Sequence, residues 1–140
     1  DNYHSQNSHF FPSLIKKIHE SKIYNKKQIT LWGNGRAKRE VIHVDDLADA
    51  CIFFMKKKTS HFLINIGTGK DHSIKFYAEL ISKLISGNNK MKIIYDKSKP
   101  NGVSKKVLDI SLAKKYGWKS TMNLKVSILN TYKSYLKEIK

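Results

Sequence analysis

The sequence predicts an α/β protein in which strands and helices alternate along the chain. Short runs rich in Ile, Val and Leu are separated by longer segments that place apolar residues three or four positions apart. Two of these runs end in glycine-containing turns, at residues 33–35 and 67–69, and no internal repeat is present. Alternation of this kind is typical of α/β folds.

In the first half of the chain, Pro12 suits the first turn of a helix over residues 12–19. Residues 28–32 predict a short strand that stops at the glycine turn, and residues 40–44 predict a second strand. A helix from residue 46 to about 57 should follow, because Asp45 is a good N-cap and three lysines close the segment.

The second half continues the alternation. Ser73 predicts the N-cap of a helix with a strong apolar stripe, and Gly87 its end. Asn123 should cap the last helix in the same way. The expected elements are strands over residues 61–66 and 91–95, a loop over 96–106, a brief extended stretch over 107–109, and helices over 74–85, from 111 to before 117, and from 123 to about 139.

Length and composition limit the classes of protein that this chain can represent. Its 140 residues fit one domain, or one domain and part of another, and 40% apolar residues can supply a core. No run approaches the roughly 18–20 apolar residues of a membrane span, and no signal peptide opens the chain. With Cys51 the single cysteine, we expect a cytoplasmic protein without an internal disulfide. Because the chain starts at Asp1, we also expect it to be a piece of a longer protein.

The net charge of +16 would ordinarily indicate nucleic acid or another polyanion as the partner. However, only Arg36 and Arg39 are arginines among the 27 basic residues, and the lysines are spread along the whole chain. Nucleic-acid readers favour clustered arginine, because its guanidinium makes bidentate contacts. Dedicated nucleic-acid binding is therefore not expected, although a preference for anionic ligands is.

Residues 32–50, W-G-N-G-R-A-K-R-E-V-I-H-V-D-D-L-A-D-A, resemble the W-G-x-G-x-x-R-[ED]-F-[IL]-H-V-D-D-L-A segment of extended short-chain dehydrogenase/reductases that act on nucleotide sugars. Residues 64–69, I-N-I-G-T-G, are similar to the next signature of that superfamily. Residues 7–9, N-S-H, and 98–109, with S-K-P-N-G and K-K-V-L-D, further resemble the GDP-L-fucose synthase family. The chain would be the carboxyl-terminal portion of such an enzyme, somewhat under half of it.

The resemblance implies an NADP-dependent enzyme that epimerises C3 and C5 of GDP-4-keto-6-deoxy-D-mannose and then reduces C4. Epimerisation needs an acid and a base on opposite faces of the sugar. His9 aligns with the acid, which suits an imidazole, and would also contact the cofactor. The family's Gly-rich cofactor turn and its catalytic Tyr/Lys pair belong to its amino-terminal half, so we expect these 140 residues alone to be inactive.

The resemblance also implies substrate-binding residues, each with a structural alternative. Trp32 would offer a flat face to a sugar or base, and its structural alternative is packing in the core. Arg39 would bind a diphosphate, and its structural alternative is a surface salt bridge. Lys17 stands where the family has arginine, and its alternative is a solvated helix face. In the loop, Asn101 replaces a family aspartate and Lys106 aligns with a lysine beside the substrate; the alternative is a mobile connection.

Other polar residues are expected to be structural. His43, Asp45 and Asp46 lack zinc-site spacing, so we expect no metal, with His43 buried and Asp45 capping a helix. Cys51 should be a small core residue rather than a nucleophile. Neither glycine turn carries the full dinucleotide fingerprint.

By resemblance, residues 12–32 and 73–140 mainly build a substrate-binding lobe, and residues 39–69 end the Rossmann-like nucleotide domain. The expected partner is a GDP-sugar, and the family is commonly dimeric, which allows a homodimer. Three alternatives stay open: another nucleotide-sugar epimerase or dehydratase, a non-catalytic nucleotide-sugar module, and a polyanion binder. The affinity of a polyanion binder for its ligand would fall steeply as the salt concentration rises.

Overall fold

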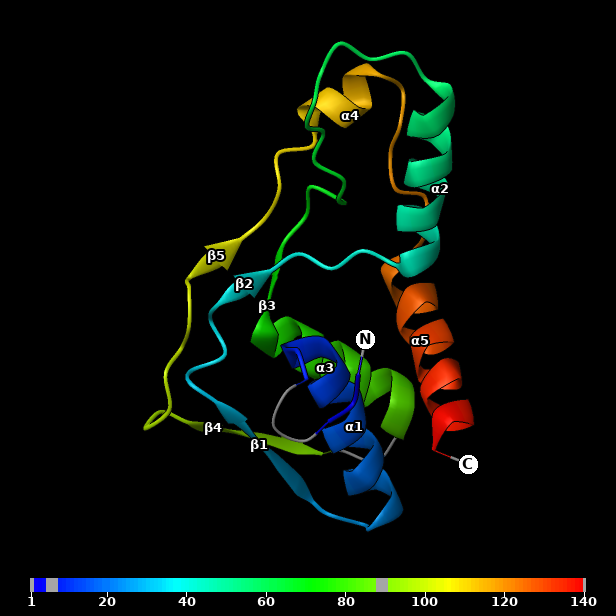
Figure 1. Cartoon of the computed structure of the whole chain (residues 1–140). Coiled ribbons are helices and arrows are strands. Elements are labelled where there is room, and N and C mark those ends of the chain that lie inside the picture. The colour runs from blue at the N-terminus through cyan, green and yellow to red at the C-terminus, as the bar shows by residue number, and fades with distance from the viewer. Residues whose placement is uncertain (1, 5–7, 88–90, 140) are drawn as a thin grey trace.

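The computed structural model describes residues 2–4, 8–87 and 91–139, and it confirms the α/β class. Helices and strands alternate along most of the chain (Figure 1). The elements in order are α1 (Phe10–Ile23), β1 (Gln28–Trp32), β2 (Lys38–Arg39), α2 (Val44–Lys56), β3 (His72–Ser73), α3 (Ile74–Ser86), β4 (Lys92–Asp96), β5 (Lys105–Lys106), α4 (Ser111–Lys115) and α5 (Leu124–Glu138).

The main body of the molecule is a two-stranded parallel sheet covered by helices. β1 pairs with β4 in the register that sets Gln28 beside Lys92 and Trp32 beside Asp96. Along β1, Ile29 and Leu31 are buried while the alternate residues are exposed, so one side of this strand faces the core and the other faces out. Helix α1 packs on β1 and on α3, and α3 packs in turn on α5 (Figure 1).

The larger core lies between these helices and the sheet. Ile15 and Ile18 of α1 meet Tyr77 and Ile81 of α3, and all four side chains are fully buried. Ile128 of α5 closes the same cluster. The apolar stripe predicted for residues 74–85 therefore lies at the centre of the core of the main body.

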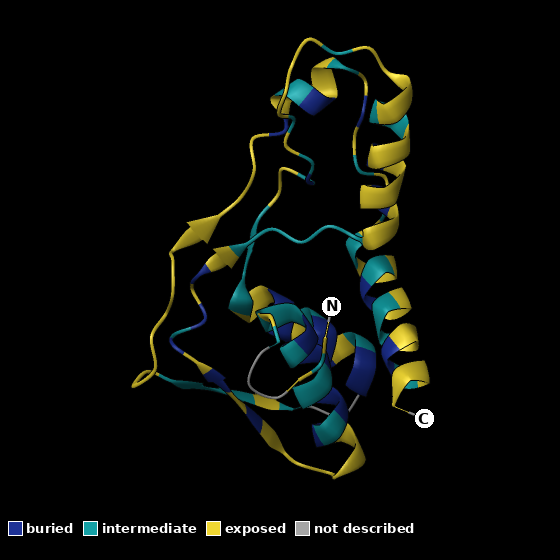
Figure 2. Cartoon of the chain, in the orientation of Figure 1, coloured by how far each residue is buried: buried dark blue, intermediate teal, exposed yellow. Residues whose placement is uncertain are grey.

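A second, smaller sheet joins the main body to the rest of the chain. β2 is its middle strand, antiparallel to β3 and parallel to β5. Beyond it, α2, α4 and their connections extend away from the main body (Figure 1). A second core cluster there contains Ala50, Ala113 and Trp118, and most of α2 remains exposed (Figure 2).

The helix ends agree closely with the capping residues in the sequence. Ser73 accepts a hydrogen bond from the Phe76 N–H at the start of α3, and Asn123 accepts one from Lys125 at the start of α5. Helix α1 begins earlier than expected, at Phe10. No helix in the described part of the chain is both long and apolar enough to cross a membrane.

Two strand predictions are wrong. Residues 40–44 form no strand: the Glu40 N–H still bonds to the Lys106 carbonyl, but the pairing ends there and Val44 begins α2. Residues 61–66 form no strand either, and Phe62 and Leu63 are strongly exposed. A strand is defined by hydrogen bonds to a neighbour, and among the described residues neither 41–44 nor 61–66 pairs with one. The strands that form instead, β2 and β3, have only two residues each, which is too short for a periodic signal.

Candidate functional site

Trp32 ends β1 with its side chain turned outward. The residue is 66% exposed, and the Lys99 ammonium lies 5.8 Å from the centroid of its ring. Core packing, the structural alternative for Trp32, is therefore wrong. An exposed indole beside a cation presents a flat surface on which a sugar or base can stack.

The loop after β4 is attached to the turn that follows Trp32. The Asn34 N–H donates a hydrogen bond of 2.7 Å to the Asn101 side-chain oxygen. Gly33 has a φ of +75°, and a Cβ there would lie 2.6 Å from the same oxygen. Asn101 thus holds the loop against the turn, and its amide nitrogen could donate to a substrate from there.

Arg39 lies in β2, directly beside Lys106 of β5 in the strand register. Its Nη1 donates hydrogen bonds of 2.7 Å to the carbonyls of Lys38 and Val103, so its partners are backbone oxygens rather than a surface carboxylate. Lys106 is exposed. Lys105, the neighbour of Lys38 across the strands, lies 3.7 Å from the Asp71 carboxylate. The β2–β5 pair is therefore strongly cationic.

Lys17 reaches the main sheet from α1. Its ammonium lies 3.4 Å from the Thr30 carbonyl oxygen, two residues before Trp32 on the same strand. The loop after β4 thus contacts Trp32 through Lys99, the turn after Trp32 through Asn101, and Arg39 through the Val103 carbonyl, and Lys17 is attached to the strand that ends at Trp32.

His9 lies elsewhere, at the N-cap of α1. Its side chain is exposed and lines a cavity of about 1230 Å³, which His43, His72 and Tyr77 also line and which the other predicted site residues do not. Asn7 of the N-S-H motif falls outside the described residues.

Tyr77 connects the His9 end of α1 to β2. The ring of Phe10, which follows His9, lies 5.7 Å from the Tyr77 ring, and the Tyr77 hydroxyl donates a 2.9 Å hydrogen bond to the Arg39 carbonyl. Burial, then the charges of Glu40 and Asp71, raise the pKa of Tyr77 to about 12. The phenol therefore stays neutral at physiological pH and keeps donating to β2.

Glu40 joins distant segments beside the candidate site, and the sequence reasoning did not single it out. Its carboxylate accepts hydrogen bonds from the N–H groups of Thr68 and Gly69 in the I-N-I-G-T-G motif and from the Leu108 N–H beyond β5. The signal was the acidic position of the R-[ED] motif next to Arg39.

The same contacts decide whether the second glycine turn can hold a dinucleotide. A phosphate cradle needs free backbone N–H groups, and those of Thr68 and Gly69 donate to Glu40 instead. The described residues of this turn therefore do not fit NADP, in agreement with its incomplete fingerprint.

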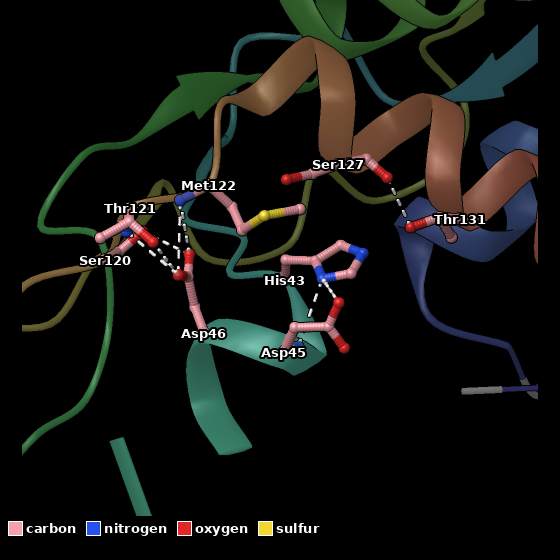
Figure 3. A network of polar contacts seen from close by, with 8 residues as sticks. All are labelled: His43, Asp45, Asp46, Ser120, Thr121, Met122, Ser127 and Thr131. Atoms are coloured by element: carbon pink, nitrogen blue, oxygen red, sulfur yellow. Dashed lines mark hydrogen bonds and ion pairs between the residues drawn. The ribbon is translucent and has the colours of Figure 1, made fainter. Parts of the chain in front are cut away.

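A second carboxylate network holds the start of α2 (Figure 3). Asp46 is only 4% exposed and accepts hydrogen bonds from the Ser120 and Thr121 hydroxyls and from the Thr121 and Met122 N–H groups. Burial alone would raise the pKa of this carboxyl, but the hydrogen bonds from Ser120, Thr121 and Met122 lower it below its usual 3.8. Asp46 is structural, as expected.

Two expectations for this region are wrong. His43, not Asp45, is the N-cap of α2: its Nδ1 accepts a hydrogen bond from the Asp45 N–H, and its side chain is 9% exposed, so the helix starts two residues earlier. Cys51 is exposed rather than in the core, because it lies on the outward side of α2, while Ala50 packs inward.

One pair of residues has the sequence spacing of a catalytic Tyr/Lys pair without its geometry. Tyr95 and Lys99 have the Tyr-x-x-x-Lys spacing, which places two side chains on one face only in a helix. Tyr95 is in β4, and the chain turns before Lys99, whose ammonium lies over Trp32 instead. The two residues do not form a catalytic Tyr/Lys pair.

Comparisons with known proteins agree with this fold. Residues 1–67 match the NAD dependent epimerase/dehydratase family. Among solved structures, a GDP-mannoheptose C4 reductase from Campylobacter jejuni with NADP bound superposes with a TM-score of 0.80 at 26% identity, covering 96% of this chain and 48% of that one. The chain therefore has a Rossmann-like α/β fold, and its first 67 residues are similar to the NAD dependent epimerase/dehydratase family.

Within that class, the chain is similar to GDP-L-fucose synthases along almost its whole length. It is 40% identical over 139 residues to a probable GDP-L-fucose synthase of Oryza sativa subsp. japonica, covering 99% of this chain and 42% of that protein. It is 35% identical to the GDP-L-fucose synthase of Escherichia coli K12, covering 97% of this chain and 44% of that protein. The resemblance predicted from the sequence is confirmed, and the chain spans less than half the length of these relatives.

Proposed function

We propose that this chain supplies the substrate-binding part of a nucleotide-sugar epimerase/reductase that makes GDP-L-fucose from GDP-4-keto-6-deoxy-D-mannose. The observation that carries the proposal is that the loop after β4 contacts both Trp32, through Lys99, and Arg39, through the Val103 carbonyl, while Lys106 pairs with Arg39, in a chain 40% identical to a probable GDP-L-fucose synthase. Trp32, Arg39 and Lys106 each have a chemistry suited to a different part of a nucleoside-diphosphate sugar.

Substrate binding in this proposal divides among those side chains. Arg39 and Lys106, on adjacent strands, offer two cations to the diphosphate, and a guanidinium can bind its oxygens in pairs. Trp32 offers a flat face to the sugar or base. Lys17 and Asn101 lie at the edge of the same region, where Lys17 adds positive charge and Asn101 fixes the loop.

His9 is proposed as the acid of the epimerisation. A ketone at C4 makes the protons on C3 and C5 labile, because the carbonyl oxygen takes the resulting negative charge. Inversion then requires a proton to return to the opposite face of each carbon. His9 suits this step because an imidazole can carry and donate a proton. Its exposed side chain lines a cavity that Tyr77, the hydrogen-bond partner of the Arg39 carbonyl, also lines, so in this proposal the sugar extends from Arg39 toward that cavity.

We propose NADP as the cofactor of the intact enzyme, with His9 the residue of this chain that contacts it. When bound, NADP supplies the hydride for reduction at C4. The Thr68 and Gly69 N–H groups are taken by Glu40 rather than free for a phosphate, and the Gly-rich cofactor turn and the catalytic Tyr/Lys pair belong to the amino-terminal half of the family, so we expect that the 140-residue chain does not oxidise NADPH in the presence of the ketosugar. Steady NADPH consumption by this chain alone would contradict that part of the proposal.

The remaining proposals concern organisation. Residues 12–32 and 73–140 would mainly form the substrate lobe, which the larger core supports, and residues 39–69 would mainly end the nucleotide domain, whose α2 packs with Ala113 and Trp118. A cytoplasmic location agrees with a single, unpaired cysteine. A homodimer agrees with the habit of the family.

The test is calorimetric titration of the chain with GDP and then UDP, at low and at moderate salt. We expect selective GDP binding that largely survives the salt increase, because a few directed contacts dominate it. Lys106→Ala should weaken GDP binding about fivefold to tenfold. Lys133→Ala, which removes the same charge from an exposed position on α5, should leave it unchanged.

The net charge of +16 favours one competing function, binding of a nucleic acid or another polyanion. In that case a single-stranded oligonucleotide would bind in the same titration, and its affinity would fall steeply as the salt concentration rises. Equal loss on Lys106→Ala and Lys133→Ala would also favour the polyanion, because such binding depends on total charge rather than on position. Preference for UDP over GDP would instead indicate a different nucleotide-sugar enzyme.

A further inference from the structure

The β2–β5 strand pair gathers like charges, whose repulsion destabilises the pairing unless another group offsets it. Lys38 lies beside Lys105, and Arg39 beside Lys106, so two like-charged pairs occupy adjacent positions of a ladder only two residues long. Like charges on neighbouring strands destabilise their pairing. The Asp71 carboxylate, 3.7 Å from Lys105, relieves one of these pairs only in part.

Glu40 follows this pair directly and binds on both sides of it. One carboxylate oxygen, Oε1, accepts hydrogen bonds of 2.5 Å from Thr68 N and 2.6 Å from Gly69 N, and one of 3.1 Å from the Thr68 hydroxyl. The other oxygen, Oε2, accepts a 2.7 Å bond from Leu108 N. The carboxylate therefore joins the glycine turn to the segment that leaves β5.

The backbone around Glu40 is arranged to leave room for this carboxylate. A Cβ on Gly67 would lie 2.5 Å from Oε1, so only glycine fits there without moving the carboxylate. The Glu40 N–H also donates to the Lys106 carbonyl, at 3.1 Å. Through its side chain and main chain, Glu40 thus fixes where Lys106 stands relative to Arg39.

We propose that Glu40 is a positioning residue, which holds Arg39 and Lys106 side by side so that the two cations meet one diphosphate group. The inference rests on the proposed function for the identity of that anion. Glu40 would not itself bind the diphosphate, because both of its oxygens are engaged by backbone N–H groups and its negative charge repels an anion. Its negative charge also lowers the cost of gathering four cations in so small a sheet.

Glu40→Gln is the discriminating substitution, because an amide has one oxygen and one donor nitrogen. If the amide oxygen faces Thr68 and Gly69, the NH2 group faces the Leu108 N–H and the link to β5 is lost. If the amide is turned over, the link to the glycine turn is lost instead. Either orientation breaks one half of the connection while it keeps the size of the side chain.

Asp46→Asn is the matched control. Asp46 is also a carboxylate that ties a distant segment to its own element by hydrogen bonds to backbone N–H groups and hydroxyls, but that segment contains none of the proposed substrate contacts. A merely structural role for Glu40 would make the two variants equivalent. Both would lose stability, and both would keep the GDP affinity of the folded fraction.

Two measurements on the 140-residue chain test the proposal. In GDP calorimetry, Glu40→Gln should bind at least about tenfold more weakly than wild type, and Asp46→Asn within about twofold of it. In amide hydrogen exchange, Glu40→Gln should raise exchange at residues 67–69 or 104–108, and Asp46→Asn only at residues 120–122. Equal GDP affinity for the two variants would overturn the proposal.

If Glu40→Gln does not fold, Gly67→Ala replaces it, since a Cβ there displaces the same carboxylate; unchanged GDP affinity in that variant overturns the proposal. If wild type binds no GDP, the proposed function fails, and the exchange data then decide about Glu40 alone. Unchanged exchange at both 67–69 and 104–108 in Glu40→Gln would show that Glu40 positions neither segment.

Discussion

Removal of the Asp46 carboxylate should be among the most destabilising single changes in the part of the molecule that contains α2 and α4. Asp46→Ala deprives four donors of their acceptor: the hydroxyls of Ser120 and Thr121, and the N–H groups of Thr121 and Met122. The hydroxyls can rotate toward water. The two N–H groups belong to a backbone held over the start of α2, so they cannot find new partners without moving the chain (Figure 3).

The magnitude follows from those two N–H groups. A hydrogen bond to a charged acceptor contributes about 1.5–3 kcal/mol, and a buried donor left without a partner costs about 1–3 kcal/mol. We therefore expect Asp46→Ala to lower the free energy of unfolding by about 3 kcal/mol. Because small domains are stable by only about 5–15 kcal/mol, this is a large fraction of the total.

Urea unfolding followed by tryptophan fluorescence measures this loss. Trp118 is 3% exposed and packs in the same small core as Ala50 of α2, whereas Trp32 is already 66% exposed, so the change in emission comes mainly from Trp118. Asp45→Ala is the control, because the Asp45 side chain is 74% exposed and should contribute only a few tenths of a kcal/mol, from the helix dipole. A loss below about 0.5 kcal/mol for Asp46→Ala would refute the reasoning.

Three further predictions follow from the same structure. The free energy of unfolding should fall in acid, because hydrogen bonds hold the pKa of Asp46 in the folded chain below its usual 3.8. The contribution of Asp46 to stability is complete above pH 3.8 and is lost as the pH falls through the lower folded value. Asp46→Asn should therefore flatten that part of a plot of urea midpoint against pH. Ile81→Ala, in the centre of the larger core, should cost about 2–5 kcal/mol in chemical unfolding, and a cost below about 1 kcal/mol would contradict the assigned core. Asn123→Ala should cost about 0.5–2 kcal/mol through loss of the α5 cap, while Asn123→Ser should recover most of it; equal melting temperatures for all three proteins would show that the cap contributes nothing.

Much of this fold could be read from local sequence. Ser73 and Asn123 mark the starts of α3 and α5 because an N-cap needs only a side-chain oxygen within reach of the next turn, which is a local property. The strand of residues 28–32 was equally readable, since its alternating burial leaves a period-two pattern. The same locality misled the prediction for residues 61–66, because apolar β-branched residues indicate a strand whether or not a neighbour is present to pair with it.

Tertiary structure alone decided how the site is assembled. The sequence by itself determined the α/β class, the capped helices and the family resemblance, because these depend on short-range spacing and on motifs that are continuous in the chain. It could not indicate that Arg39 bonds to a carbonyl 64 residues away, or that Glu40 reaches Leu108 across 68 residues. Hydrogen bonds between distant segments leave no periodicity in the sequence, so the connection of the glycine turn to the cationic strand pair became visible only in three dimensions.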